Sequence, residues 1–369
     1  MIFFLSALFF CGFGYFTAVI ILMYGLRKVR SGVSEKKPFV SVVIAARNEK
    51  TSIKTCLTAL MRQNYKSELF EVIVADDRSE DGTSLVLEEF KSIFSNLKVV
   101  RIDCVPEGVS PKKYAVSAAI DNASGVIILQ TDADCAVPEN WITGMVSRFE
   151  DGVEMVIGAA PYLHGSGMLN SFVCHEYLWN ITLSAGSIAL GHGTHASARN
   201  LGFRRKAFEN AGGYGSGETI LSGDDTLLLH RIQIQNNSGV TTIPDKSTHV
   251  YTRAPKNFKT FLRQRTRHMS TGKYFDPALI SAGGVLYGFH ILTVLSFFLG
   301  FAAPVYFKFF ILSFIWKNIV DCLAFMRTKH IFGLDIEWKK FVLNELFLLI
   351  YLAVMPVCGL FFSGKWKEN

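Results

Sequence analysis

The chain has 369 residues, half of them hydrophobic, and a formal net charge of +7. This length suits one catalytic domain with additions, and the apolar excess, which gathers at the two ends of the chain, argues against a purely soluble protein. Much of the positive charge lies beside the apolar ends, where it would meet anionic lipid headgroups, and no zinc-finger spacing or aromatic-basic strand pattern occurs. We therefore expect no nucleic-acid partner.

The first predicted element is a membrane-spanning helix, Ile2–Leu26, which has no charged side chain. About 20 apolar residues cross the hydrocarbon core of a bilayer as a helix. A cleaved signal peptide is the alternative, but no basic residue precedes the apolar run and no small-x-small cleavage site follows it. The basic residues that follow predict that this flank stays inside the cell. They are Arg27, Lys28, Arg30, Lys36 and Lys37.

Residues 38–275 are expected to form a catalytic domain between an anchor at 1–30 and membrane helices at 281–364. In this region short β-branched runs alternate with amphipathic runs. The expected strands are 39–45, 71–75, 98–103, 126–130 and 154–158, and the helices between them include 52–63, 83–94 and 112–123. Strands spaced by helices predict βαβ units, and hence an α/β fold with a mostly parallel sheet covered on both faces.

Polar side chains follow three of the expected strands. They are Arg47, Asn48 and Glu49 after the first, Asp76 and Asp77 after the second, and Asp132 and Asp134 after the fourth. The carboxyl ends of parallel strands meet at one edge of the sheet, where ligands of open α/β sheets bind. One acidic pair is equally well explained as a helix cap. Capping alone explains three converging clusters poorly.

The same edge lacks the glycine-rich loops that usually hold phosphates. No GxxxxGK[ST] sequence is present, and no GxGxxG follows the first strand. A diphosphate at an acidic edge needs a divalent cation to reverse the local charge. Asp132 and Asp134 offer hard oxygen ligands that suit Mg²⁺ or Mn²⁺.

These motifs resemble those of the family 2 glycosyltransferases, whose catalytic domain has the GT-A fold. The sequence AARNE at 45–49 resembles the first nucleotide loop, ADDRSEDGT at 75–83 is similar to the stretch that recognises base and ribose, and Asp132-Ala133-Asp134 matches the DxD motif. The similar region covers about residues 39–269. The resemblance implies metal binding by Asp134 and Asp132. It implies nucleotide-sugar binding by Ala46, Arg47, Asn48, Glu49, Asp76, Asp77, Lys112 and Asp132.

The catalytic and acceptor residues also come from this resemblance. Gly223-Asp224-Asp225 is similar to the ED motif, which implies that Asp225 is the catalytic base, with Asp224 beside it. The segment at 200–205 looks like the one that lines the acceptor side and begins with Asn200.

A further motif, QRTRH at 264–268, is similar to the QRxRW motif of membrane polysaccharide synthases. It implies that Gln264, Arg267 and His268 face the acceptor or the diphosphate. His268 stands where the synthases have tryptophan, which argues against processive polymerisation. Residues 256–273 are also typical of a basic amphipathic segment lying on a membrane.

Three more membrane spans are expected at 284–304, 305–326 and 341–362. The second contains Lys317 and Asp321, one helical turn apart, which indicates either a local ion pair or a role in substrate handling. The seven cysteines are dispersed without CxxC spacing, which favours reduced thiols in a reducing compartment.

Together these features predict an integral protein of the inner or plasma membrane with a cytoplasmic catalytic domain. The expected activity is inverting, hexosyl-type transfer from a UDP- or GDP-sugar to a lipid-linked or glycan acceptor in the cell envelope. Two alternatives stay open: a processive synthase that translocates its polymer, and a non-catalytic nucleotide-binding scaffold in the membrane.

Overall fold

The computed structural model describes residues 1–214, 224–235, 239–269 and 277–361. The chain divides into two compact units, each of which is described by itself. Of the described residues, the helical unit takes 1–27, 164–186 and those from 254 onward, and the sheet unit takes 28–163 and those within 187–253.

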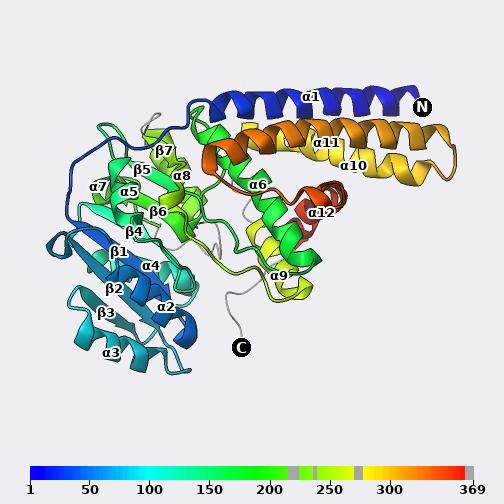
Figure 1. The fold of residues 1–369 in the computed structure, drawn as a ribbon. Helices are drawn as coiled ribbons and strands as arrows, with labels where there is room; N and C mark the ends of the chain where they lie inside the picture. Colours follow the sequence, from blue (N-terminus) through cyan, green and yellow to red (C-terminus); the bar gives the residue numbers. More distant parts are fainter. Residues whose placement is uncertain (215–223, 236–238, 270–276, 362–369) are drawn as a thin grey trace. The chain divides into compact units, whose positions relative to one another are not determined.

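Seven strands among the described residues form one sheet, in the order β3-β2-β1-β4-β6-β5-β7 (Figure 1). They are β1 (Val40–Ala46), β2 (Phe70–Asp77), β3 (Leu97–Ile102), β4 (Ile127–Gln130), β5 (Met155–Gly158), β6 (Leu201–Arg204) and β7 (Val240–Ile243). Only β6 runs antiparallel to its neighbours, β4 and β5, whereas the other pairs are parallel. The expected α/β fold with a mostly parallel sheet is confirmed.

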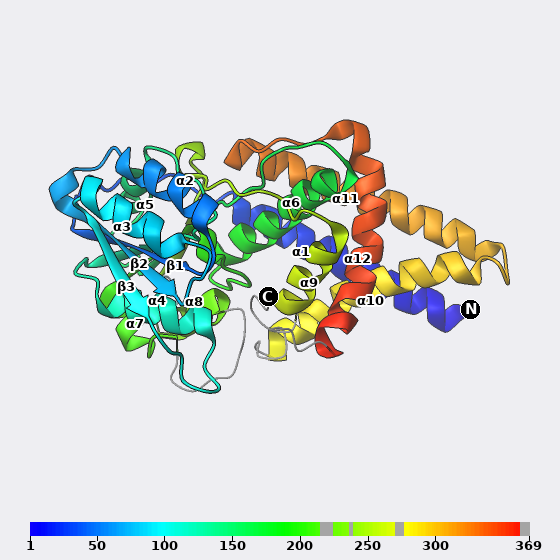
Figure 2. The ribbon, with the colours of Figure 1, turned by 90° about the horizontal axis from the view of Figure 1, so that it is seen from below.

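Both faces of the sheet are buried because the strands are apolar on both sides. Along β1, Val42 and Ile44 join one hydrophobic core, and Val43 between them joins the other. Such continuous apolar runs are typical of strands that helices cover on both faces. The covering helices are α2 (Lys50–Met61), α3 (Thr83–Ile93), α4 (Pro111–Asp121), α5 (Trp141–Ser147), α7 (Arg205–Asn210) and α8 (Asp224–Gln235). Figure 2 shows α2, α3 and α5 on one face and α4, α7 and α8 on the other, in agreement with the two cores.

The strand order creates a switch point at β1, which pairs with β2 on one side and with β4 on the other. The connections from β1 to β2 and from β3 to β4 therefore lead away in opposite directions. In open α/β sheets, ligands bind outside the carboxyl ends of the strands at such a point. Here those ends are followed by Arg47 and Thr131, and the neighbouring β2 ends at Asp77.

The helical unit contains five long helices and part of a sixth among the described residues. They are α1 (Ile2–Leu26), α9 (Phe258–Met269), α10 (Pro277–Leu299), α11 (Val305–Phe332) and α12 (Phe341–Phe361), with most of α6 (Met168–Ile188). Helices α1, α10 and α11 pack against one another, and α12 packs against α9 and α10 (Figure 1).

Three helices in the described part of the chain are long and apolar enough to cross a membrane, judged by length and composition. They are Ile2–Leu26, Val305–Phe332 and Trp338–Cys358, and a shorter apolar stretch is Gly283–Leu299. The sequence predicts spans in these same four places. The tail with Lys365 and Lys367 lies outside the described residues.

The expected Lys317–Asp321 ion pair is present, with 2.7 Å between Nζ and Oδ2. It belongs to a larger buried network, because the Lys317 ammonium also pairs with Glu345 from α12. Tyr15 from α1 donates a hydrogen bond to Asp321 over 2.5 Å, and His175 from α6 lies 2.7 Å from the other oxygen of Glu345. Four helices are therefore joined through one buried polar chain.

Candidate active site

The loops after β1 and β2 are fastened to each other by their own side chains. The backbone N–H of Asn48 donates to Ser79 Oγ over 3.0 Å, and the Asn48 side-chain oxygen accepts from the N–H of Glu80 over 2.9 Å. Asn48 and Arg78 both have positive φ, 53° and 52°, a conformation that asparagine tolerates better than most residues. The backbone N–H of Glu49 donates to Thr83 Oγ1 over 2.9 Å. These hydrogen bonds join the two predicted nucleotide loops to each other.

Asp76 and Asp77 are the last two residues of β2, whereas the sequence places them just after the strand. Both are buried. Asp77 is held by two arginines, Arg78 Nε at 2.8 Å and Arg47 Nη1 at 3.5 Å. Asp76 Oδ2 accepts a hydrogen bond from Ser84, but its buried Oδ1 has no hydrogen-bond partner among the described residues. Buried polar atoms are rarely left unpaired, so this oxygen is positioned to accept a hydrogen bond from a ligand.

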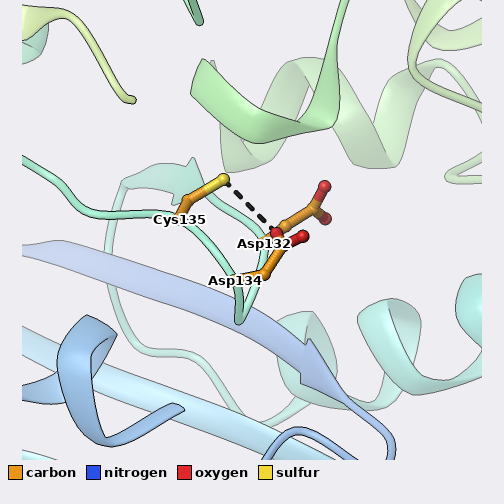
Figure 3. A group of neighbouring side chains, drawn as sticks. All are labelled: Asp132, Asp134 and Cys135. Atoms are coloured by element: carbon orange, nitrogen blue, oxygen red, sulfur yellow. Dashed lines mark hydrogen bonds between the residues drawn. The ribbon is translucent and has the colours of Figure 1, made fainter. Parts of the chain in front are cut away.

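Asp132, Asp134 and Cys135 follow β4, and one ligand atom from each lies within 4.8 Å of the others (Figure 3). Lys112, in the first turn of α4, pairs with Asp132 over 2.7 Å. Although the Asp134 side chain reaches solvent, the surrounding protein limits its hydration. This desolvation, followed by the charges of Asp132 and Glu49, raises the pKa of Asp134. The site therefore has an excess of negative charge.

This donor set fits a hard divalent cation, since two carboxylates converge and their repulsion is only partly balanced by Lys112. Cys135 is the third possible ligand of this group. Burial, followed by the charges of Asp132 and Asp134, raises the pKa of its thiol well above the usual value of 9.0. The thiol donates to Asp134 Oδ1 over 3.6 Å, the dashed line in Figure 3.

Arg199 is a site residue that the sequence motifs do not reveal. Its charge opposes the upward shift in the pKa of Asp134, and its guanidinium lies over the ring of Tyr162, 4.8 Å from the centroid. Thr131 at the end of β4 fixes the backbone here, because its hydroxyl donates to the Arg199 carbonyl over 2.8 Å. The only sequence signal is a basic residue directly before Asn200.

Asp225 lies in the first turn of α8, and both its carboxylate oxygens are oriented by backbone groups. Oδ2 accepts from the N–H of Ala198 over 2.7 Å, and Oδ1 accepts from the N–H of Thr226 over 3.0 Å. Ala198 directly precedes Arg199, so Asp225 is tied to the segment that carries this arginine. Asp224 begins α8, and its side chain lies outside the described residues.

Asn200 is fully buried, and its side chain is hydrogen-bonded to three separate segments of the chain. Its side-chain oxygen accepts from Trp141 Nε1 over 2.9 Å, and its amide group donates to the carbonyls of Ala159 and Thr248 over 2.7 and 2.8 Å. The expected acceptor segment at 200–205 begins at the last residue of a short 3-10 turn, Ala198–Asn200, and continues as β6 and the first residue of α7. Gln264, Arg267 and His268 lie on α9 and belong to the helical unit.

A mostly parallel sheet with a switch point, an acidic pair after β4 and hydrogen-bonded loops after β1 and β2 together form the arrangement of GT-A glycosyltransferases. The fold is similar to that of mannosyltransferase PcManGT from Pyrobaculum calidifontis in complex with GDP-Man and Mn²⁺. The TM-score is 0.60 at 17% sequence identity, with 95% of this chain and 98% of that chain covered. This likeness shows the fold.

The family follows from sequence models. One described as Glycosyl transferase family group 2 matches residues 127–362, and one described as Glycosyl transferase family 2 matches residues 41–212. The chain therefore belongs to the family 2 group of glycosyltransferases, which confirms the resemblance seen in its motifs.

Two curated relatives are similar over part of the chain. Glycosyltransferase AglE of Haloferax volcanii is 33% identical over 132 residues, 35% of this chain and 42% of the relative. The undecaprenyl-phosphate 4-deoxy-4-formamido-L-arabinose transferase of Proteus mirabilis is 31% identical over 123 residues, 33% of this chain and 37% of the relative. The chain thus matches less than half the length of either.

Proposed function

We propose that this chain transfers a hexose-type sugar, with inversion, from a UDP- or GDP-sugar to a lipid-linked or glycan acceptor of the cell envelope. Transfer is assigned to residues 38–275, anchored by helices within 1–30 and 281–364 in the inner or plasma membrane with the catalytic domain on the cytoplasmic side. The apolar helices support the anchoring. The relative named for undecaprenyl phosphate supports a lipid-linked acceptor.

The proposal depends most on the arrangement of Asp132, Asp134 and Lys112 at the carboxyl edge of the sheet. Asp134 and Asp132 would hold Mg²⁺ or Mn²⁺, and the cation, when bound, neutralises the charge of the departing diphosphate. Lys112 and Arg199 add positive charge close to these carboxylates. Asp76 Oδ1 is available to a hydroxyl or N–H donor of the nucleoside.

Asp225 is the proposed base. The acceptor hydroxyl attacks the anomeric carbon, the bond from that carbon to the diphosphate oxygen breaks, and Asp225 takes the hydroxyl proton. The hydrogen bonds from Ala198 and Thr226 fix the carboxylate, and each of its oxygens keeps acceptor capacity for this proton. Asn200 is left out of the proposed acceptor contacts because its side chain is fully occupied inside the protein.

We expect Asp225→Asn to bind nucleotide nearly as well as the native protein while sugar transfer falls by about 100-fold or more, since only proton abstraction is lost. The measurement uses the purified full-length protein with Mn²⁺, a panel of radiolabelled UDP- and GDP-sugars and extraction of lipid products. Asp121→Asn, an exposed carboxylate at the end of α4, is the matched control and keeps full activity.

Turnover retained by Asp225→Asn would reject the base assignment. Nucleotide binding by the native protein in the presence of Mn²⁺ without transfer from any sugar of the panel would reject the enzyme and favour the nucleotide-binding scaffold. Product size decides between single addition and processive synthesis, and we expect single addition.

A further inference from the structure

A pocket of about 250 Å³ lies in the helical unit between the end of α1 and the last turns of α11. It is lined by Ile20, Met23, Tyr24, Arg27 and Arg327. The four lining residues from the first of these segments have the spacing i, i+3, i+4 and i+7, so they share one helix face. The pocket is smaller than the roughly 300 Å³ at which typical pockets for whole small molecules begin. It suits a headgroup whose remainder lies outside.

The lining separates into an apolar part and a cationic part. Ile20 and Met23 provide the apolar part. Arg27 and Arg327 provide the cationic part, and Arg27 directly follows Leu26, the last residue of α1. None of the lining side chains is acidic. Arg327 Nε is buried and has no hydrogen-bond partner among the described residues. A buried guanidinium N–H without an acceptor is costly, so an acceptor from outside the chain is expected.

We propose that this pocket binds the phosphate of an anionic phospholipid of the surrounding membrane, held between Arg27 and Arg327, with an acyl chain along Ile20 and Met23. Guanidinium groups bind phosphate oxygens with paired, charge-assisted hydrogen bonds. Basic pockets between membrane helices at the cytoplasmic boundary are suited to anionic headgroups. The inference goes beyond sugar transfer and rests only on the proposed membrane insertion of the helical unit.

The test uses native mass spectrometry of the purified full-length protein with equimolar phosphatidylglycerol and phosphatidylcholine. We expect phosphatidylglycerol to be retained preferentially, and Arg27→Gln/Arg327→Gln to weaken its apparent affinity by about thirtyfold, the effect of two interfacial arginines. The matched control, Lys308→Gln/Lys339→Gln, removes the same formal charge from exposed residues of the same unit outside the pocket and keeps the preference. Each single arginine variant is measured too, in case the double variant does not fold.

Equal retention of the two lipids by the native protein, or equal loss in the control and the pocket variant, would overturn the site. An undecaprenyl phosphate that displaces phosphatidylglycerol at equal concentration, with the same dependence on the arginines, would overturn the phospholipid assignment.

Membrane fractionation separates this inference from the proposed function. Absence of the protein from membranes refutes the proposed anchoring, whereas a membrane-bound, active protein without lipid preference refutes the pocket alone.

Discussion

Asp134 is held in surroundings that oppose its ionisation. Desolvation and the charges of Asp132 and Glu49 raise its pKa above the usual 3.8. A raised pKa in the folded state means that the folded protein holds this proton more tightly than the unfolded chain does. The corresponding stability is present below pH 3.8 and is lost as pH rises through the folded-state pKa.

A prediction follows for Asp134→Asn. Without metal and at neutral pH, the variant should melt at a higher temperature than the native protein, and this advantage should shrink as pH falls through the folded-state pKa of Asp134 and be absent below about pH 4. With excess Mn²⁺ the order should reverse, because the cation stabilises only the protein that binds it. Differential scanning fluorimetry with EDTA or Mn²⁺ measures both effects, with Asp121→Asn as the control. A variant less stable than the native protein in EDTA would contradict the proposed electrostatic repulsion.

Single residues were predictable from sequence where a motif carries them. Asp132, Asp134 and Lys112 are brought together as the motif order implies. Arg199 and the structural use of Asn200 were not predictable, since both depend on contacts with distant segments. Asn200 is hydrogen-bonded to Trp141, which lies 59 residues earlier in the sequence, and no local sequence pattern predicts that contact.

At the scale of elements, the buried polar chain of the helical unit joins α1, α6, α11 and α12. Lys317 and Asp321 are visible in the sequence as an i, i+4 pair, but Glu345 comes from another helix. All three side chains are completely buried, so removing Lys317 takes the buried lysine cation from both carboxylates and leaves them with only Tyr15 and His175 as partners. A buried ion pair broken on one side is strongly destabilising.

We therefore expect Lys317→Met to lower the free energy of unfolding by about 3–5 kcal/mol. Replacing the carboxylates as well, by Asp321→Asn and Glu345→Gln, should restore part of the loss because no unpaired charge is then buried. Thermal unfolding in detergent measures the change. Lys308→Met, at an exposed position of the same helix, is the control. A Lys317→Met protein that melts like this control would show that the network contributes nothing.

The strands show which elements a sequence pattern can define. β1 to β5 were expected within one or two residues of their observed bounds, because buried β-branched runs are distinctive. β6 and β7 were not expected. β6 contains Gly202 and ends at Arg204, so its sequence does not resemble a buried strand. β7 is a β-branched run, Val-Thr-Thr-Ile, which the sequence prediction overlooks. β6 is a strand because it pairs with β4 and β5, an arrangement that only the folded chain specifies.

At the scale of the whole molecule, the two units are interleaved along the chain. The segment His164–Gly186, which contains most of α6, belongs to the helical unit although the sheet unit precedes and follows it. Its side chains are buried by partners that come later in the sequence. Phe172 contacts Phe347, and Trp179 contacts Phe325. Glu176 is paired with Arg265 of α9.

A chain of residues 28–253 should therefore be insoluble although it contains every strand of the sheet. Without the later helices, α6 would expose its aromatic side chains and leave Glu176 without its buried cation. Supernatant yield and gel filtration measure this outcome, with the detergent-solubilised full-length protein as the reference. Phe172→Ser/Trp179→Ser in the truncated chain should recover part of the solubility. The aromatic partners of both residues are absent from residues 28–253, so the two substitutions remove exposed apolar surface without breaking a contact to those partners. A soluble monomer of 28–253 with cooperative unfolding would show that α6 is stable without these helices.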